Sequence, residues 1–187
     1  MTRLFLIRHG EPSAAWGQSE DPGLSVLGRA QAEAAAARLP GGLAIMTSPM
    51  LRCRETAAAY EARLGAGAKV EPRVSEVATP AGLADRRAWL AETFPWRDGA
   101  DQRDWATLAP GLHRWRADVL AAVQERTQDT AVFSHFIAIN AIVGAALGAP
   151  QTIVCRPSHA SITELALEEG VLRLVSRGEE MQGGDVR

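Results

Sequence analysis

The feature that most constrains the fold of this chain is the alternation of short apolar runs with longer segments of helical periodicity. The apolar runs predict strands at 3–8, 43–47, 69–71, 130–134, 161–167 and 171–176. Helix signals occupy 25–39, 49–64, 84–93, 111–126 and 136–147. This alternation predicts an α/β fold with a mostly parallel central sheet. The last two strands flank Glu168-Glu169-Gly170 and predict a hairpin at one edge of the sheet.

The size and composition of the chain indicate one globular domain over 1–187. A chain of 187 residues can bury a sizeable core, and 47% apolar with 22% charged residues is typical of a folded protein. No internal repeat or linker interrupts the sequence. The polar, glycine-rich end at 178–187 predicts a frayed tail.

Charge and cysteine content restrict the environment and the partners. A net charge of -2 argues against a nucleic-acid partner, which would need a broad basic surface. No apolar run is long enough for a secretory signal or a membrane span, so we expect no membrane partner. Cys53 and Cys155 are too few for a disulfide framework or a zinc cluster, and they suit a reducing, cytoplasmic location. No sequence feature specifies an oligomeric state.

Basic side chains follow several of the predicted strands. Arg8 ends the first strand and His9 follows it, Arg52 lies one turn into the helix after the second, and His135 closes the strand at 130–134. Because the carboxyl ends of parallel strands line one edge of a sheet, we expect these four side chains to converge there. A cationic, donor-rich cluster of this kind suits a phosphate dianion.

Two predicted helix starts lie at the same edge. Ser48 is expected to be an N-cap with Pro49 at the first helical position, and a second helix begins at Phe136. Their backbone N–H groups and positive dipole ends would add to the anion site.

Each of these residues also has a structural interpretation. A lone histidine at a strand end is more often a hydrogen-bonded structural residue, and a lone arginine is often a surface ion pair. Only their convergence on one edge favours function. His113, in a predicted surface helix, and His159, in a polar turn, are interpreted as structural, and Cys53 lies on an apolar helix face and is interpreted as core.

Four segments of the sequence carry a resemblance to a known family. The segments LIRHGEP, LSVLGRAQAEAAA, TSPMLRCRETA and FSH resemble, in order and spacing, the histidine phosphatase superfamily of phosphoglycerate-mutase-like enzymes with an Arg-His-Gly motif. The resemblance implies a three-layer α/β/α sandwich. It also implies that His9 is a nucleophile that becomes a phosphohistidine, that Arg8 and Arg52 clamp the phosphoryl oxygens, and that His135 donates to the same group.

Elementary chemistry agrees with these implied roles. A neutral imidazole is a competent nucleophile, and fork-shaped guanidinium groups match phosphate geometry. The family's carboxylic acid, which protonates the leaving alkoxide, corresponds by position to Glu76, although Glu76 could also be a plain surface residue. Glu11 competes for that role, but its place directly after the motif favours a loop-shaping residue.

The chain departs from the family pattern at two places. Many members have Asn where this chain has Ala15, which removes one phosphate or substrate contact. Phe136 and Ile137 replace a common Gly-Gly after the second histidine; the backbone N–H of Phe136 can still bind phosphate, while its ring would narrow the pocket.

The sequence therefore predicts a metal-independent phosphomonoesterase that acts on a small-molecule phosphate ester without a cofactor. A mutase-type phosphoryl transferase and a non-catalytic phospho-ligand binding module remain as alternatives. A metallophosphatase lacks its ligand motifs here, and neither cysteine has the arginine that a Cys-based phosphatase requires. The compact length favours hydrolysis over phosphoryl shuttling.

Substrate choice is expected to depend on the tryptophan-rich stretch at 89–115. Trp115 belongs to an apolar helix face with Leu112, Val119 and Val123. Trp96 and Trp105 lie in less regular sequence and are hypothesised to line a lid that accepts an organic leaving group.

Overall fold

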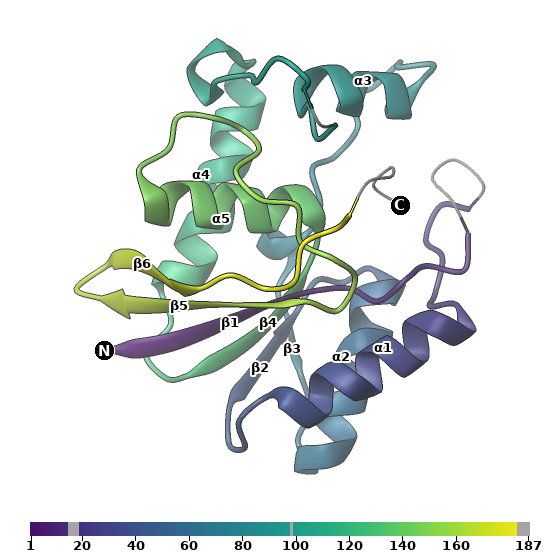
Figure 1. Cartoon of the computed structure of the whole chain (residues 1–187), viewed down its shortest axis with the longest axis vertical. Coiled ribbons are helices and arrows are strands. Elements are labelled where there is room, and N and C mark those ends of the chain that lie inside the picture. Colours follow the sequence, from purple (N-terminus) through teal and green to yellow (C-terminus); the bar gives the residue numbers. More distant parts are fainter. Residues whose placement is uncertain (15–18, 98, 183–187) are drawn as a thin grey trace.

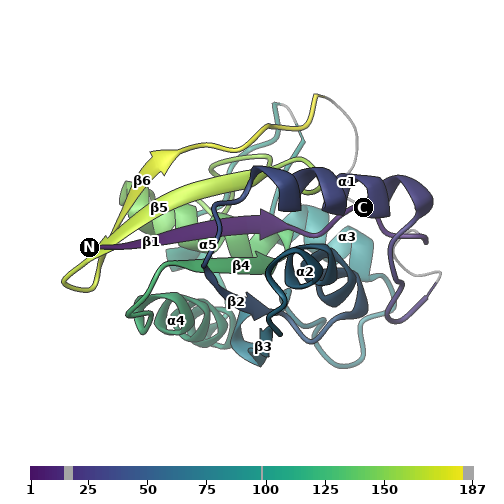
Figure 2. The same ribbon diagram turned by 90° about the horizontal axis from the view of Figure 1, so that it is seen from below.

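A mixed sheet forms the centre of the protein. The computed structural model describes residues 1–14, 19–97 and 99–182. Within them, six strands pair in the order β3-β2-β4-β1-β5-β6. Their bounds are β1 Thr2–Arg8, β2 Ala44–Thr47, β3 Lys69–Val70, β4 Thr130–Ser134, β5 Ile162–Glu168 and β6 Val171–Ser176. Neighbours from β3 to β1 are parallel, whereas β5 is antiparallel to both β1 and β6. Figure 2 shows this order from β6 at the top to β3 at the bottom.

Helices cover both faces of the sheet. Their bounds are α1 Val26–Arg38, α2 Leu51–Leu64, α3 Arg86–Thr93, α4 Pro110–Gln124 and α5 Phe136–Leu147. In Figure 1, α1 and α2 lie below the sheet, α4 and α5 lie above it, and α3 lies farther out on the α5 side. The predicted three-layer α/β/α sandwich is confirmed.

The alternation of side chains along β1 explains why two layers of helices can form. Leu4 and Leu6 join the apolar cluster beneath α4 and α5. Phe5 and Ile7 join the opposite cluster, which also contains Tyr60 of α2. Because successive strand residues point to opposite faces, a continuous apolar run buries both faces of a central strand.

The predicted hairpin between β5 and β6 is also confirmed. Glu169 and Gly170 have φ angles of 50° and 78°. Two successive positive φ angles match the tight turn that joins antiparallel strands, and a glycine at the second position lowers its cost.

The predictions for the start of the helix after β2 and for the C-terminal tail are wrong. The helix after β2 does not begin at Ser48-Pro49: α2 starts at Leu51, and its N-cap is Met50. The tail is not frayed over 178–182, because Ser158 N–H donates to Glu179 O at 2.8 Å and Met181 N–H donates to Arg156 O at 2.8 Å. Residues 183–187 lie outside the described part of the chain.

In the described segments, every helix is too short or too polar to cross a lipid bilayer.

Candidate active site

The residues that follow β1, β2 and β4 meet at one edge of the sheet. Arg8 is in register with Ser134, and His9 N–H donates to Ser134 O at 3.0 Å. Ser48 N–H donates to Phe133 O at 3.0 Å, which brings the residue after β2 to the same level. The structure therefore brings His9, Ser48 and His135 together at the carboxyl edge, as the parallel strands predicted.

His9 is held with one nitrogen available. Its Nδ1 lies 2.8 Å from Gly10 O, and because a carbonyl oxygen only accepts, Nδ1 carries the proton and Nε2 keeps its lone pair. Burial, followed by the charge of Arg52 and the proximity of His135, holds the pKa of His9 well below its usual range. A buried, neutral imidazole with a free lone pair is what nucleophilic attack on phosphorus requires.

Gly10, the glycine of the Arg-His-Gly motif, is required for a steric reason. A Cβ on Gly10 would lie 2.5 Å from the carbonyl oxygen of Gly28 in α1, and a Cβ on Gly28 would lie 2.1 Å from Glu11 O. The loop after His9 can follow the first turn of α1 only because both positions lack a side chain. Glu11 shapes this loop, since its carboxylate accepts from Ser25 Oγ, the N-cap of α1, at 2.9 Å.

His135, the N-cap of α5, is fixed in the opposite tautomer. Its Nδ1 accepts from Arg52 Nη2 at 3.2 Å, because a guanidinium group can only donate. Its pKa is held well below the usual range by burial and then by Arg52, so the neutral ring carries its proton on Nε2. That nitrogen lies 2.8 Å from Ser48 Oγ and 3.3 Å from Cys53 Sγ. Ser48, which was expected to be the N-cap of a helix, thus pairs with His135 through its hydroxyl.

The two arginines provide the positive charge of the site. Arg8 is fully buried and donates from Nη1 to Pro157 O at 2.9 Å, while its guanidinium carbon lies 5.3 Å from the ring centre of Phe136. Burial lowers the pKa of Arg8 to about 9, which leaves it charged at neutral pH. Arg52 Nη1 lies 3.8 Å from a carboxylate oxygen of Asp21.

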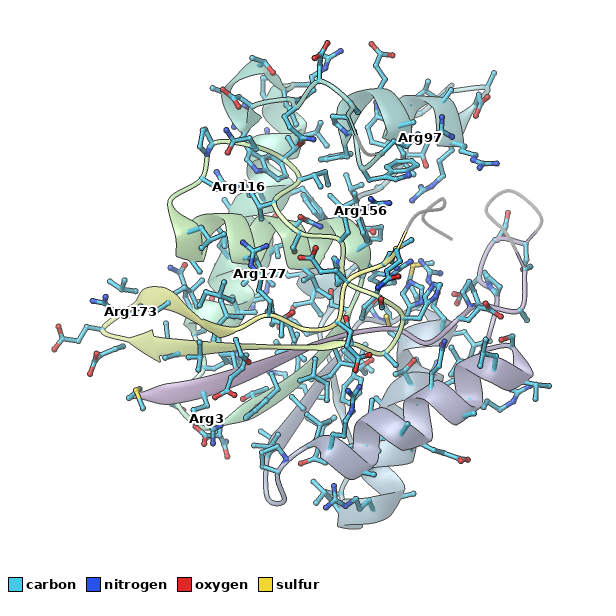
Figure 3. All side chains as sticks on the ribbon, viewed as in Figure 1. Arg3, Arg97, Arg116, Arg156, Arg173 and Arg177 are labelled. Carbon is cyan, nitrogen blue, oxygen red and sulfur yellow. The ribbon has the colours of Figure 1, made fainter. Side chains whose placement is uncertain are left out.

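Four of the other arginines lie away from this edge of the sheet. Figure 3 shows Arg3 and Arg173 near the end of the sheet where β1 begins, and Arg97 and Arg116 in the part of the molecule around α3 and α4.

Both helix starts that were expected to receive an anion already hold an acidic side chain of the protein. The N–H of Leu51, at the start of α2, donates to Asp21 at 2.9 Å. The N–H of Ile137, in the first turn of α5, donates to Glu76 Oε2 at 3.0 Å. Phe136 is the first residue of α5, and its buried ring packs on Arg8 rather than standing across an open pocket. Asp21 was not predicted to belong to the site, because only the folded loop brings it to α2.

Glu76 lies beside this cluster in a buried position. Its two oxygens accept the N–H groups of Val77, at 3.2 Å, and Ile137. Burial raises the pKa of Glu76, outweighing these hydrogen bonds and the charge of Arg52, which act in the opposite direction. Ser134 Oγ donates to Val74 O at 2.7 Å and so ties the segment that carries Glu76 to the end of β4. A carboxyl whose pKa is raised by burial, beside the arginines of the site, suits a proton donor.

The lid hypothesis for the tryptophans is wrong. Trp96 and Trp105 are both almost fully buried, in a cluster that includes Phe94, Phe136 and Ile137. Trp105 packs edge-on against Phe94 and stacks on Trp115, with ring centres 5.9 and 6.2 Å apart. These rings form the core between α3, α4 and the start of α5, and Phe136 links that core to Arg8.

A stability prediction follows from this burial. We expect Trp96→Ala to lower the free energy of unfolding by about 3–5 kcal/mol, because it removes a large buried ring. Denaturant titration would measure the loss, and Trp89→Ala, at a partly exposed position of α3, serves as the control with a smaller loss. Equal losses in the two variants would contradict the core role of Trp96.

The remaining residues that the sequence singled out have different outcomes. Ala15 lies outside the described residues. His113 is exposed on α4, as expected. His159 is not a simple turn residue, since its ring centre lies 5.8 Å from that of His9. Among the described residues, no three His, Cys, Asp or Glu side chains are arranged to hold a metal ion.

Comparisons with known proteins agree with the fold. The sequence model of the histidine phosphatase superfamily (branch 1) matches residues 4–180 of this chain. The chain belongs to the histidine phosphatase superfamily.

Solved structures extend this result. A mycobacterial glucosyl-3-phosphoglycerate phosphatase superposes with a TM-score of 0.72 at 25% identity, covering 97% of this chain and 100% of that chain. A phosphoserine phosphatase of Entamoeba histolytica, in complex with 3-phosphoglyceric acid, has a TM-score of 0.70 at 19% identity, covering 96% and 98% of the two chains. A phosphoglycerate mutase of Thermus thermophilus superposes with a TM-score of 0.62 at 21% identity, covering 95% of this chain and 99% of that chain. A search of proteins with curated functions finds no significant match. The family and its structures support a phosphatase or another phosphoryl-transfer enzyme.

Proposed function

We propose that this protein is a metal-independent phosphomonoesterase that hydrolyses small phosphorylated metabolites through a phosphohistidine on His9. The observation that carries the proposal is the free Nε2 lone pair of a buried, neutral His9 beside Arg52, His135 and Glu76, a carboxyl whose pKa is raised by burial. The name of the mycobacterial relative supports hydrolysis and makes phosphoglycerate esters the first compounds to screen.

The proposed reaction has two displacements. His9 Nε2 attacks phosphorus, the P–O bond to the leaving group breaks, and Glu76 gives its proton to the departing alkoxide oxygen. Water then attacks the phosphohistidine, its proton passes to the Glu76 carboxylate, and the P–N bond breaks to release phosphate and restore neutral His9. Arg8 and Arg52 stabilise the charge on the non-bridging oxygens during both displacements.

His135 changes its partner in this scheme. Without substrate, Arg52 donates to His135 Nδ1. When a phosphoryl group binds, the Nε2–H of the neutral His135 can turn from Ser48 to a phosphoryl oxygen, so that His135 donates to the substrate without a change in its protonation.

The direct test is hydrolysis of p-nitrophenyl phosphate in the presence of EDTA, together with capture of enzyme that carries a labelled phosphoryl group from the substrate. We expect turnover to survive the chelator and the label to be acid-labile and base-stable, as a P–N bond is. Activity that EDTA abolishes and a divalent metal restores would contradict the proposal. Transfer of the phosphoryl group to a phosphorylated-acid acceptor faster than to water would instead establish a mutase.

A second test uses the pH dependence. His9 must be neutral, so activity is present above its lowered pKa and is lost as the pH falls through it. Glu76 must be protonated, so activity on alkyl esters is present below its raised pKa and is lost as the pH rises through it. We therefore expect kcat/KM for an alkyl phosphate to peak on the acidic side of neutrality. A rate that rises continuously through neutral pH would contradict these protonation states.

A further inference from the structure

A third imidazole, that of His159, lies against His9. The ring centres are 5.8 Å apart with the planes tilted by 44°, which compares with 5.3 Å between His9 and His135. Sheet order explains the approach. Since β1 lies between β4 and β5, His9 has the residue after β4 on one side and the residues before β5 on the other.

The direction of β5 decides which of its ends lies at the site. β5 is antiparallel to β1, and its first residue, Ile162, is in register with Ile7. The chain therefore enters β5 at the edge where β1 ends, and the turn at 158–161 lies beside Arg8 and His9.

This turn is firmly anchored to the strand end. Ala160 N–H donates to Arg8 O at 3.0 Å, and Arg8 N–H donates to Ser161 O at 3.3 Å. Ser158 N–H donates to Glu179 O at 2.8 Å, which adds the 178–182 segment to the support. Ala160 has a φ of 55°, a left-handed conformation that costs a non-glycine residue about 1 kcal/mol and persists only where neighbouring contacts hold it. The backbone thus fixes the place of His159 relative to His9.

The His9 ring needs such support. Its one described hydrogen bond, from Nδ1 to Gly10 O, restrains one edge of the ring but leaves tilting about that bond possible. Attack on phosphorus depends on the direction of the Nε2 lone pair, and a misplacement of about 1 Å can cost about a hundred-fold in rate. Ring contacts with His135 on the β4 side and with His159 on the β5 side limit this tilting.

We propose that His159 is a positioning residue that holds the His9 imidazole, by ring packing, in the orientation for attack on phosphorus. This inference rests on the proposed function of His9 as the nucleophile. His159 takes no part in proton or phosphoryl transfer in this scheme, so an aromatic ring without nitrogen should replace it.

The test compares His159→Ala with His159→Phe in single-turnover formation of the phosphohistidine from p-nitrophenyl phosphate. We expect the Ala variant to form it about ten-fold more slowly, with unchanged affinity for inorganic phosphate, because orientation and not binding is lost. The Phe variant should recover most of the rate. His113→Ala, which removes an exposed histidine of α4, is the matched control and should behave as the unaltered protein.

Two outcomes would overturn the proposal. One is a His159→Ala rate equal to that of the unaltered protein, and the other is a Phe variant as slow as the Ala variant. If the unaltered protein forms no phosphohistidine, the proposed function fails, and the ring of His9 is then followed by imidazole ¹⁵N–¹H spectra. Signals that broaden in His159→Ala and not in His159→Phe would still support positioning, and identical spectra would overturn it.

Discussion

His9→Ala should abolish phosphohistidine formation and lower the turnover of p-nitrophenyl phosphate on the order of 10⁴-fold or more, as the loss of a covalent nucleophile does in other enzymes. The arginines remain in this variant, so phosphate affinity should persist while chemistry is lost. The expected pattern is a fall in kcat with little change in binding of inorganic phosphate. Steady-state kinetics and a phosphate-binding titration measure the two effects separately.

The control for this variant is again His113→Ala, since it removes the same side chain from an exposed helix position. Residual His9→Ala turnover close to that of the control would show that another group attacks phosphorus. Loss of phosphate affinity together with turnover would instead indicate that the Ala variant disturbs the arginines.

Glu76→Gln should slow the hydrolysis of alkyl phosphates by about 10²–10⁴-fold, because the amide cannot give a proton to a poor leaving group. Aryl esters with an activated leaving group should keep most of their rate. The comparison of p-nitrophenyl phosphate with an alkyl phosphate on the same variant measures this difference.

The aryl ester also tests the integrity of the loop. Glu76 accepts two backbone N–H groups, and a Gln side chain presents only one acceptor oxygen, so one buried donor is left without its bond. That defect would slow both ester types alike, whereas loss of the acid slows only the alkyl ester. An unchanged ratio of the two rates in Glu76→Gln would contradict the role of Glu76 as the acid. Glu11→Gln is the matched control, because Glu11 competes for the role by sequence yet binds Ser25 in the loop at the start of α1. It should leave the ratio of the two rates unchanged.

The sequence was most informative about those site residues that stand directly next to the end of a strand along the chain. Arg8 and His9 directly follow an apolar run, and His135 directly follows another, so a parallel sheet was enough to bring them to one edge. The same holds for Arg52, which is the second residue of α2 and follows the end of β2 closely. These positions depend on local order alone.

Prediction was wrong where a side chain has two competing local interpretations. Ser48-Pro49 has the signature of a helix start, yet the Ser48 hydroxyl pairs with His135 and α2 begins at Leu51. Trp96 and Trp105 lie in irregular sequence, which suggested a lid, but large rings lose most from exposure to water and so form a core of their own.

The sequence by itself determined the alternation of strands and helices, the two-faced burial of β1 and the basic residues at the strand ends, because each follows from periodicity or from direct succession along the chain. Only the tertiary structure decided that His159 lies against His9, that Asp21 reaches the start of α2, and that Met181 Sδ lies 3.2 Å from Arg8. These contacts join residues that are far apart in sequence, and they depend on the antiparallel direction of β5 and on the paths of loops. No local pattern encodes either of these, because the free energy that fixes them comes from packing between whole elements.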